Sequence, residues 1–304
     1  MKKTPVWIDC AAGIDDYAAI AFAHSLKEIE IAGISAVYGK SELENAYAGC
    51  LAIVSALGAD YPVCRGAEKP LLKSLEICEK DAFDGCVLSE NLTCTKESAW
   101  DALYHCAKEH PGQLRLICLG PLTNIGAAFM KYPELAELLH SVSVKGGAAI
   151  FGDVTPAAEF NIYSDPHSAD IVFRAGAKLN VLFREATAPI RLLPDELSEL
   201  ENVGNARLNT LCTHLRSALA RAGETDAPGA AVGCVCPVMY LIHPEFFTVD
   251  EVGVMVETRG SITNGRTVTD AYSDRQFPFK NAVAALGSDR DAILRAFKET
   301  LREL

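Results

Sequence analysis

The chain has 304 residues, of which 28 are basic and 40 acidic, so its formal net charge is −12 and its pI is about 5.1. This length suits one large α/β domain with a well-buried core, and a composition of 49% apolar and 22% charged residues excludes a disordered or fibrous chain. The acidic balance without a clustered basic patch argues against a nucleic-acid partner, and no apolar run reaches the length that spans a membrane.

The first half of the chain alternates short apolar runs with segments of helical periodicity. Short runs rich in Val, Ile and Leu are typical of buried strands, whereas apolar residues spaced three or four apart are typical of helices. These patterns predict strands at residues 6–8, 29–38, 114–119 and 141–144, and helices at residues 15–26, 42–57, 100–109 and 123–139.

The second half continues the alternation less regularly. A buried strand is predicted at residues 179–183, and two late strands, suited to a sheet edge, at residues 248–258 and 266–270. Helices are predicted at residues 165–175 and 206–222, from about residue 237, and at residues 289–304.

Strand–helix alternation of this kind is typical of an open, mostly parallel, Rossmann-like sheet flanked by helices. No repeat, linker or low-complexity segment divides the sequence, so we expect a single domain over residues 1–304. Two long loop-like stretches, residues 76–95 and 223–233, are candidates for mobile lids.

The cysteines favour a reducing environment. There are eleven, an odd number that is too dilute for a disulfide scaffold, and no C-x-x-C pair occurs. The closest spacing, Cys234 and Cys236, is a weak signal for metal or redox chemistry. We therefore expect a cytoplasmic protein.

The turn after the first predicted strand concentrates negative charge. It carries Asp9, Asp15 and Asp16 within eight residues. Helix capping accounts for one aspartate at a helix N-terminus but poorly for three. In an open parallel sheet, ligands bind beyond the carboxyl ends of the strands. The turn therefore predicts a site for a cation or for ligand hydroxyl groups.

Several segments resemble one enzyme family. Residues 7–16 look like the D-x-D-P-G-x-D-D turn of the inosine–uridine nucleoside hydrolases, and residues 119–125 are similar to their G-P-L-T-N-I segment. Residues 146–166 resemble the family's G-G…A-E-F-N-I-x-x-D-P region, and residues 256–270 resemble its late strand pair. The resemblance implies the nucleoside hydrolase fold and hydrolysis of the N-glycosidic bond of a ribonucleoside.

The resemblance also implies roles for individual residues. In the family, a bound calcium orients and acidifies the attacking water and holds the ribose hydroxyls, while a carboxylate takes the proton of the water. The three aspartates of the first turn match the catalytic positions, and a Glu-Phe-Asn segment matches the ribose-holding pair. Carried over onto this sequence, the matching residues are Asp9, Asp15, Asp16, Glu159, Phe160 and Asn161, with Leu119 offering a backbone carbonyl to the metal.

The sequence departs from the family at the metal's own ligands. The family's second turn aspartate, a calcium ligand and presumed base, is Ala11 here, and its H-D-P turn aligns with residues 233–235, which replaces a calcium carboxylate by the thiol of Cys234. Two family asparagines align with Lys40 and Asp153. Since Ca²⁺ needs six to eight oxygen ligands and a thiol suits it poorly, we predict that the calcium is lost and that no cofactor is bound.

Lys40 suggests a substitute for the ion. An ammonium close to Asp15 or Asp16 would interact with them by on the order of a few kcal/mol at an effective dielectric constant of about 20. The alternative that stays open is a Lys40 side chain that points into solvent.

Other candidates carry weaker signals. Cys10, Cys234 and Cys236 could converge on a soft metal such as Zn²⁺, although buried thiols are more often packing residues. Asp84 occupies a position where the family often carries a His-Gly pair in the first lid, so Asp84 or Asp153 is a candidate acid for the leaving base.

Two hypotheses of function remain. The first is a nucleoside hydrolase that cleaves a ribonucleoside or related glycoside without calcium. The second is a non-catalytic protein that binds a nucleoside or sugar in the same pocket, as the loss of the base at Ala11 suggests. In both, the partner is a small molecule, and the resemblance implies a homodimer or homotetramer.

Overall fold

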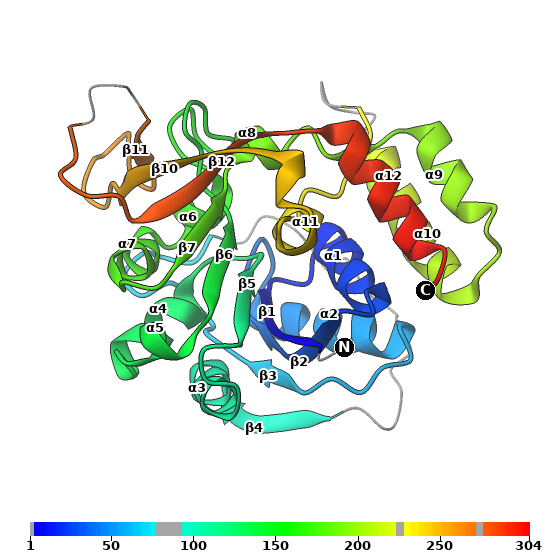
Figure 1. The fold of residues 1–304 in the computed structure, drawn as a ribbon, viewed down its shortest axis with the longest axis horizontal. Helices are drawn as coiled ribbons and strands as arrows, with labels where there is room; N and C mark the ends of the chain where they lie inside the picture. Colours follow the sequence, from blue (N-terminus) through cyan, green and yellow to red (C-terminus); the bar gives the residue numbers. More distant parts are fainter. Residues whose placement is uncertain (1–2, 77–92, 223–227, 272–275) are drawn as a thin grey trace.

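The computed structural model describes residues 3–76, 93–222, 228–271 and 276–304. Its centre is a ten-stranded sheet in the order β11-β10-β12-β7-β6-β5-β1-β2-β3-β4, with helices on both faces (Figure 1). The eight strands from β12 to β4 are parallel, whereas β10 is antiparallel to β11 and β12. The predicted open, mostly parallel α/β fold is confirmed.

The strands are short, and two of them form a separate small sheet. Their bounds are β1 Thr4–Cys10, β2 Ile29–Ala36, β3 Val63–Arg65, β4 Cys94–Ser98, β5 Arg115–Cys118, β6 Ser141–Lys145, β7 Leu179–Leu182, β10 Phe247–Val256, β11 Thr267–Asp270 and β12 Ala282–Ser288 in the main sheet, and β8 Arg191–Leu192 and β9 Ala230–Ala231 in the small one.

The helices fill the connections between strands. Their bounds are α1 Ile14–Ser25, α2 Leu43–Ala56, α3 Ala99–Glu109, α4 Thr123–Lys131, α5 Leu135–Leu138, α6 Phe160–Ser164, α7 Pro166–Arg174, α8 Arg184–Thr187, α9 Pro194–Glu201, α10 Ala206–Ala222, α11 Val235–Ile242, the 3₁₀ turn η1 Pro244–Phe246 and α12 Arg290–Leu301.

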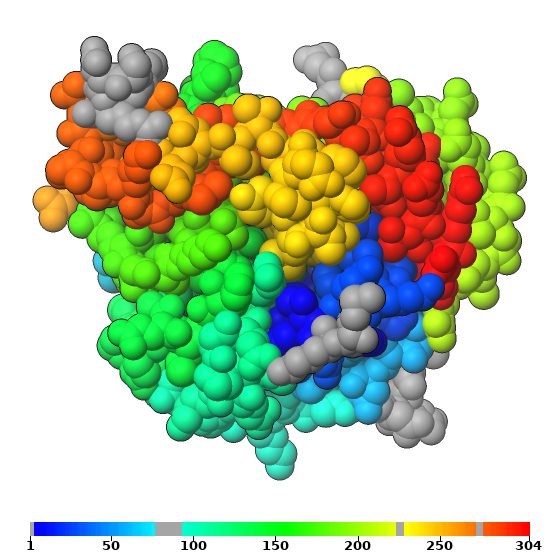
Figure 2. Space-filling model, viewed as in Figure 1, coloured from blue at the N-terminus to red at the C-terminus, as the bar shows by residue number. Residues whose placement is uncertain are grey.

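The alternation of side chains along β1 separates two hydrophobic cores. Val6 and Ile8 belong to the core formed with α1, α2, α10, α11 and α12, whereas Trp7 belongs to the core formed with α3, α4 and α7. This follows from strand geometry, since successive side chains point to opposite faces of a sheet. In the space-filling view, α11 in yellow lies against α1 in blue and α12 in red (Figure 2).

The helix predicted at residues 123–139 is interrupted. α4 ends at Lys131, and the amide of Tyr132 donates the last helical bond, to the Ala128 carbonyl (2.8 Å). Pro133 is the cause, because a proline disfavours helical backbone at the residue before it and has no N–H of its own. The short helix α5 follows after the break.

Three strands of the main sheet escaped the sequence prediction, as did the two short strands of the small sheet. β12 lies inside the sheet, between β10 and β7, yet its sequence AVAALGS contains only one β-branched residue. β3 has three residues, and β4 is a largely exposed edge strand. Of the two predicted late strands, β11 is the edge strand and β10 lies next to it.

The chain order creates a crevice at the centre of the sheet. From β1, the parallel strands β2, β3 and β4 add on one side, whereas β5, β6, β7 and β12 add on the other. The loops that leave β1 and β5 therefore diverge, and such a switch point is where open α/β sheets bind ligands. In the parts of the chain that the structure covers, no helix has the length and apolar composition for a membrane span.

Candidate active site

A cavity of about 370 Å³ opens at the switch point, beyond the carboxyl ends of β1, β5 and β6. It is bounded by the first turn, the loop after β2, the ends of β5 and β6 and the start of α11. The predicted site residues that line it are Asp15, Asp16, Lys40, Asp153, Phe160, Asn161 and Cys234.

The two aspartates of the first turn enter the cavity from the start of α1. The Gly13 amide donates to Asp16 Oδ2 (2.9 Å), which caps the helix and fixes the Asp16 carboxylate. Asp16 is buried, and burial together with the charge of Asp15 raises the pKa of Asp16 to about 7. A carboxyl of this pKa exchanges its proton near neutral pH.

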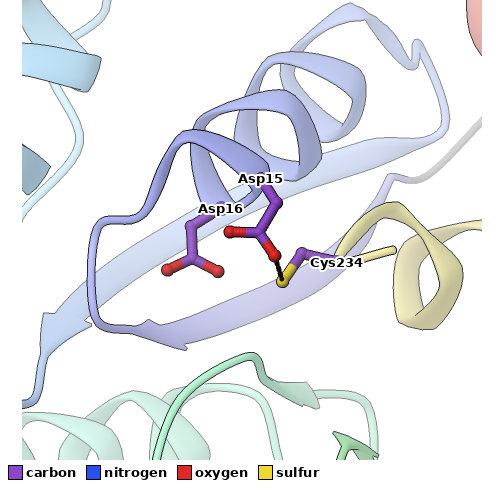
Figure 3. Close-up of side chains that lie close together, drawn as sticks. All are labelled: Asp15, Asp16 and Cys234. Carbon is purple, nitrogen blue, oxygen red and sulfur yellow. Dashed lines mark hydrogen bonds between the residues drawn. The ribbon is translucent and has the colours of Figure 1, made fainter. Parts of the chain in front are cut away.

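Cys234 reaches the aspartates from the start of α11, which packs on α1. Its thiol donates to Asp15 Oδ2 with an Sγ–Oδ2 distance of 3.0 Å (Figure 3). Burial and the nearby aspartates raise the thiol pKa well above its ordinary value, so the sulfur stays protonated. Ligand atoms of Asp15, Asp16 and Cys234 all lie within 4.8 Å of one another.

Glu159 and Asn161 are held rigidly around the start of α6. Glu159 Oε2 accepts hydrogen bonds from the amides of Gly147 (3.0 Å) and Asn161 (2.9 Å). Asn161 Nδ2 donates to the carbonyls of Leu119 (2.8 Å) and Lys145 (2.9 Å). Asn161 lines the cavity, whereas Glu159 is 1% exposed and does not. The predicted ribose-holding pair is therefore split between the cavity wall and the layer behind it.

Lys145, at the end of β6, is a site residue that the sequence analysis missed. It lines the cavity, and its Nζ lies 3.3 Å from Glu159 Oε1, with 21% of the side chain exposed. Burial by itself would lower the pKa of Lys145, but the acidic groups around it, Glu159 first among them, hold it above its ordinary value. The signal was present in the sequence: a lysine ends an apolar strand directly before Gly146 and Gly147.

Asp9 lies below the cavity and does not line it. It is fully buried, and its Oδ1 accepts hydrogen bonds from Ser35 Oγ and from Asn124 Nδ2 (2.7 Å). Burial is the largest effect on this carboxyl and raises its pKa to about 7. Asp9, predicted as a catalytic residue, therefore lies behind the cavity wall and is not among the residues that line it.

Asp153, Phe160 and Lys40 form the rim of the cavity. Asp153 Oδ1 accepts hydrogen bonds from the amides of Val154 (2.6 Å) and Phe160 (2.8 Å). Lys40 is exposed, and its Nζ lies 5.9 Å from the centre of the Phe160 ring. The same three residues also line a second cavity of about 390 Å³ next to the first.

The three predicted cysteines do not converge. Cys10 Sγ lies 3.5 Å from Cys50 Sγ, within the core of α1 and α2. Among the residues described, Asp15, Asp16 and Cys234 are the one group of three side chains able to share an ion, and Cys10 and Cys236 are not in it. The structure does not support the alternative of a thiol-rich zinc site, because Cys10 points from β1 into the core, where it packs as the sequence analysis expected of a buried thiol.

Some predicted features fall outside the described residues. These are Asp84 and most of the two lid candidates, which include residues 77–92 and 223–227. Besides Lys145, the cavity contains polar residues that the sequence did not single out: Ser41, Asn45, Arg191 and Arg221.

The sequence and the structure were compared with those of known proteins. Residues 6–295 match the sequence profile of the inosine-uridine preferring nucleoside hydrolases. The chain belongs to this family. The predicted resemblance is confirmed.

Curated nucleoside hydrolases are similar over most of their length. The non-specific ribonucleoside hydrolase RihC of Salmonella paratyphi B is 33% identical over 291 residues, which cover 93% of each chain. The pyrimidine-specific ribonucleoside hydrolase RihA of Klebsiella pneumoniae is 31% identical over 277 residues, which cover 88% of this chain and 89% of the relative.

Solved structures of nucleoside hydrolases share the fold. The plant nucleoside hydrolase PpNRh1 and the purine-preferring ribonucleoside hydrolase from Gardnerella vaginalis each superimpose with a TM-score of 0.90 at 27% identity, over 98% of both chains. The relatives' names state different base preferences. Family membership therefore fixes the type of bond that these enzymes cleave but leaves the base open.

Proposed function

We propose that this protein hydrolyses the N-glycosidic bond of a ribonucleoside, or of a related glycoside, without a bound calcium ion. The observation that carries the proposal is the cavity at the switch point, where Asp15, Asp16 and Asn161 converge with the ammonium group of Lys145. Membership of the nucleoside hydrolase family supports the reaction.

The donor atoms around the cavity support the loss of calcium. Ca²⁺ takes six to eight oxygen ligands, several of them charged. The matching oxygens here are the carboxylates of Asp15 and Asp16 and the Leu119 carbonyl, which already accepts a hydrogen bond from Asn161 (2.8 Å). Ala11 offers no ligand, and a protonated thiol at Cys234 is a poor donor for a hard ion. With the ammonium group of Lys145 in the same cavity, these residues do not fit calcium, and no step below uses it.

The two aspartates can share the chemistry. Cleavage of a glycosidic bond develops positive charge on the sugar ring, which a fixed carboxylate nearby stabilises. A pKa of about 7 suits Asp16 to act as general base toward the attacking water at neutral pH. Asp15 and Asn161 would then hold the sugar hydroxyls, and Asp153 at the rim remains the candidate acid for the leaving base.

The rival function is binding without turnover. Its supporting observation is Ala11, because the family's presumed base is missing at that position. In this case the same cavity would hold a nucleoside or sugar, and the ligand would leave unchanged.

The deciding experiment measures reducing sugar released from inosine, uridine, adenosine, cytidine and guanosine with EDTA present. We expect release from at least one nucleoside. Asp15→Asn should reduce it on the order of 100-fold or more, since a charged contact to the transition state is lost. The matched control is Asp195→Asn, an exposed aspartate on α9 that lines neither cavity, and it should retain full activity.

Two other outcomes would contradict the proposal. Nucleosides that raise the melting temperature but release no sugar would support the binding protein. Activity that EDTA abolishes and calcium restores would refute a calcium-free mechanism.

The proposal also covers the localisation, domain organisation and assembly of the protein. We propose a cytoplasmic protein with one domain over residues 1–304 that forms a homodimer or homotetramer. The free cysteines of the described chain, including Cys10, Cys50, Cys64 and Cys118, support a reducing compartment.

A further inference from the structure

The cavity has an unusual balance of charges for a sugar site. Asp15 and Asp16 lie in its wall, Asp153 at its rim, and Glu159 directly behind it. Lys145 lies in the cavity wall, and its Nζ contacts Glu159 Oε1 (3.3 Å). The cavity therefore combines several carboxylates with an ammonium group that belongs to the protein.

A mostly buried lysine is stable only where acidic groups compensate its charge. Here the backbone of Lys145 is fixed by the parallel pairing of β6 with β5 and β7 and by the hydrogen bond from Asn161 Nδ2 to its carbonyl. The Lys145 side chain therefore extends from a rigid strand. The negative charges of Glu159 and Asp15 raise its pKa. This is a built-in counter-ion rather than a surface lysine.

We propose that the ammonium group of Lys145 takes the place of the family's calcium as the resident cation of the cavity. Its positive charge offsets the negative charge that Asp15, Asp16 and Glu159 bring to the cavity. The inference rests on the proposed function and names the residue that makes it possible without metal. Lys145 acts as a positioning residue, since its charge works through the carboxylates.

The other cations of the cavity are placed differently. Lys40 is exposed at the rim, against the ring of Phe160. The guanidinium of Arg191 donates to the carbonyls of Gly229 (2.6 Å) and Pro228 (3.1 Å). The structure therefore favours Lys145 over Lys40, the substitute suggested by the sequence.

The role has a consequence that a merely structural lysine would not have. If Lys145 neutralises the carboxylates, then a neutral side chain at this position leaves them uncompensated around a space that a cation can enter. Lys145→Met should therefore gain a response to Ca²⁺ that the parent protein lacks. The probe is calcium chloride alone, added up to 10 mM to EDTA-treated protein at pH 7.5, with melting temperature as the readout.

We expect calcium to raise the melting temperature of Lys145→Met by about 3 °C once its concentration is ten times the dissociation constant. The parent should not respond. Lys145→Arg, which keeps the charge, should behave like the parent. Lys40→Met is the matched control, because it removes the same charge from the rim of the same cavity, and it should gain no calcium response.

A second variant keeps the test decisive if Lys145→Met does not fold. Lys145→Met combined with Glu159→Gln removes both members of the buried ion pair and leaves neither charge alone. Calcium should raise the melting temperature of this double variant as well, whereas Glu159→Gln alone, which keeps Lys145, should not respond. A folded double variant that calcium does not stabilise would overturn the proposal.

The outcomes separate this inference from the proposed function. A parent that calcium stabilises, or a calcium response gained by Lys40→Met and not by Lys145→Met, would overturn the role of Lys145. If the parent releases sugar in EDTA and Lys145→Met shows no calcium response, the proposed hydrolase function is supported and the role of Lys145 is refuted. If Lys145→Met responds to calcium but the parent releases no sugar, the role of Lys145 is supported and the proposed hydrolase function is refuted.

Discussion

Asp9 is a predicted site residue that lies behind the cavity rather than in its wall. One carboxylate oxygen, Oδ1, accepts hydrogen bonds from Ser35 and Asn124, while no donor among the described residues reaches the other, Oδ2. Asn124 in turn donates to the Ala36 carbonyl (3.1 Å) and accepts from the Ala67 amide (2.7 Å). Asp9 therefore links β1 to β2 and to the start of α4, behind the cavity.

The raised pKa of Asp9 gives a prediction for stability against pH. With a pKa of about 7 in the folded state and about 3.8 unfolded, the folded protein binds more protons between these values, so the contribution of Asp9 to stability falls as pH rises from about 4 to 7. Asp9→Asn keeps the acceptor oxygen and cannot ionise. It should melt close to the parent at pH 5 and above it at pH 8.

Thermal melting of parent and Asp9→Asn across pH 5 to 8 measures this difference. Asp16 also titrates near pH 7, but it is present in both proteins and cancels in the comparison. A difference that stays constant over this range, or that has the opposite trend, would contradict a folded-state pKa of about 7 for Asp9.

At the scale of elements, the turn between β1 and α1 differs from the family pattern in its backbone. The proline of the D-x-D-P-G-x-D-D turn aligns with Ala12, whose φ of 54° lies in the left-handed region. A proline is locked near −65° and cannot adopt this conformation. The substitution thus changes the geometry that carries Ala11 and Asp15 into the cavity, in addition to the side chains.

The turn can be tested with a pair of variants. Ala12→Pro should lower the free energy of unfolding by about 2–3 kcal/mol, because its ring forces the turn into another conformation. Ala12→Gly should stay within about 1 kcal/mol of the parent, since relief of left-handed strain offsets the lost buried methyl group. Urea denaturation measures both. A proline variant as stable as the parent would mean that the turn adopts a negative φ at residue 12.

On the scale of the whole molecule, segments from across the chain build one cavity. The first turn, the end of β6 and the start of α11 meet there because the strand order reverses between β1 and β5 and because α11 packs on α1. Figure 2 shows α11 and α1 side by side on the surface. Asp15 and Cys234, 219 positions apart in sequence, thereby come within hydrogen-bond distance.

The protein is predicted to form a homodimer or homotetramer. Light scattering on the purified protein should give two or four times the 32.7 kDa of one chain. The large apolar side chains exposed around β11, Ile262, Val268 and Phe279, are consistent with a covered surface. The measured mass should not change on tenfold dilution. A mass of one chain at all concentrations would contradict the prediction.

The sequence by itself determined the fold class and most of the elements. Apolar runs and helical spacing located β1, β2, β5, β6 and β7 and the main helices, because local periodicity reflects which face of an element is buried. Motif order over nearly the whole chain identified the family. β12 was missed because strand pairing, rather than composition, makes AVAALGS a central strand.

Only the tertiary structure decided which charges meet. Sequence spacing could place Asp15 and Asp16 on one helix turn and Cys234 at an aligned position, but the separation between Lys145 and Glu159 depends on how β6 and α6 pack. Electrostatic interaction depends on distance and on burial, and neither follows from position along the chain. For that reason the sequence suggested Lys40 as the substitute cation, whereas the packed structure brings Lys145 into the cavity wall and against Glu159.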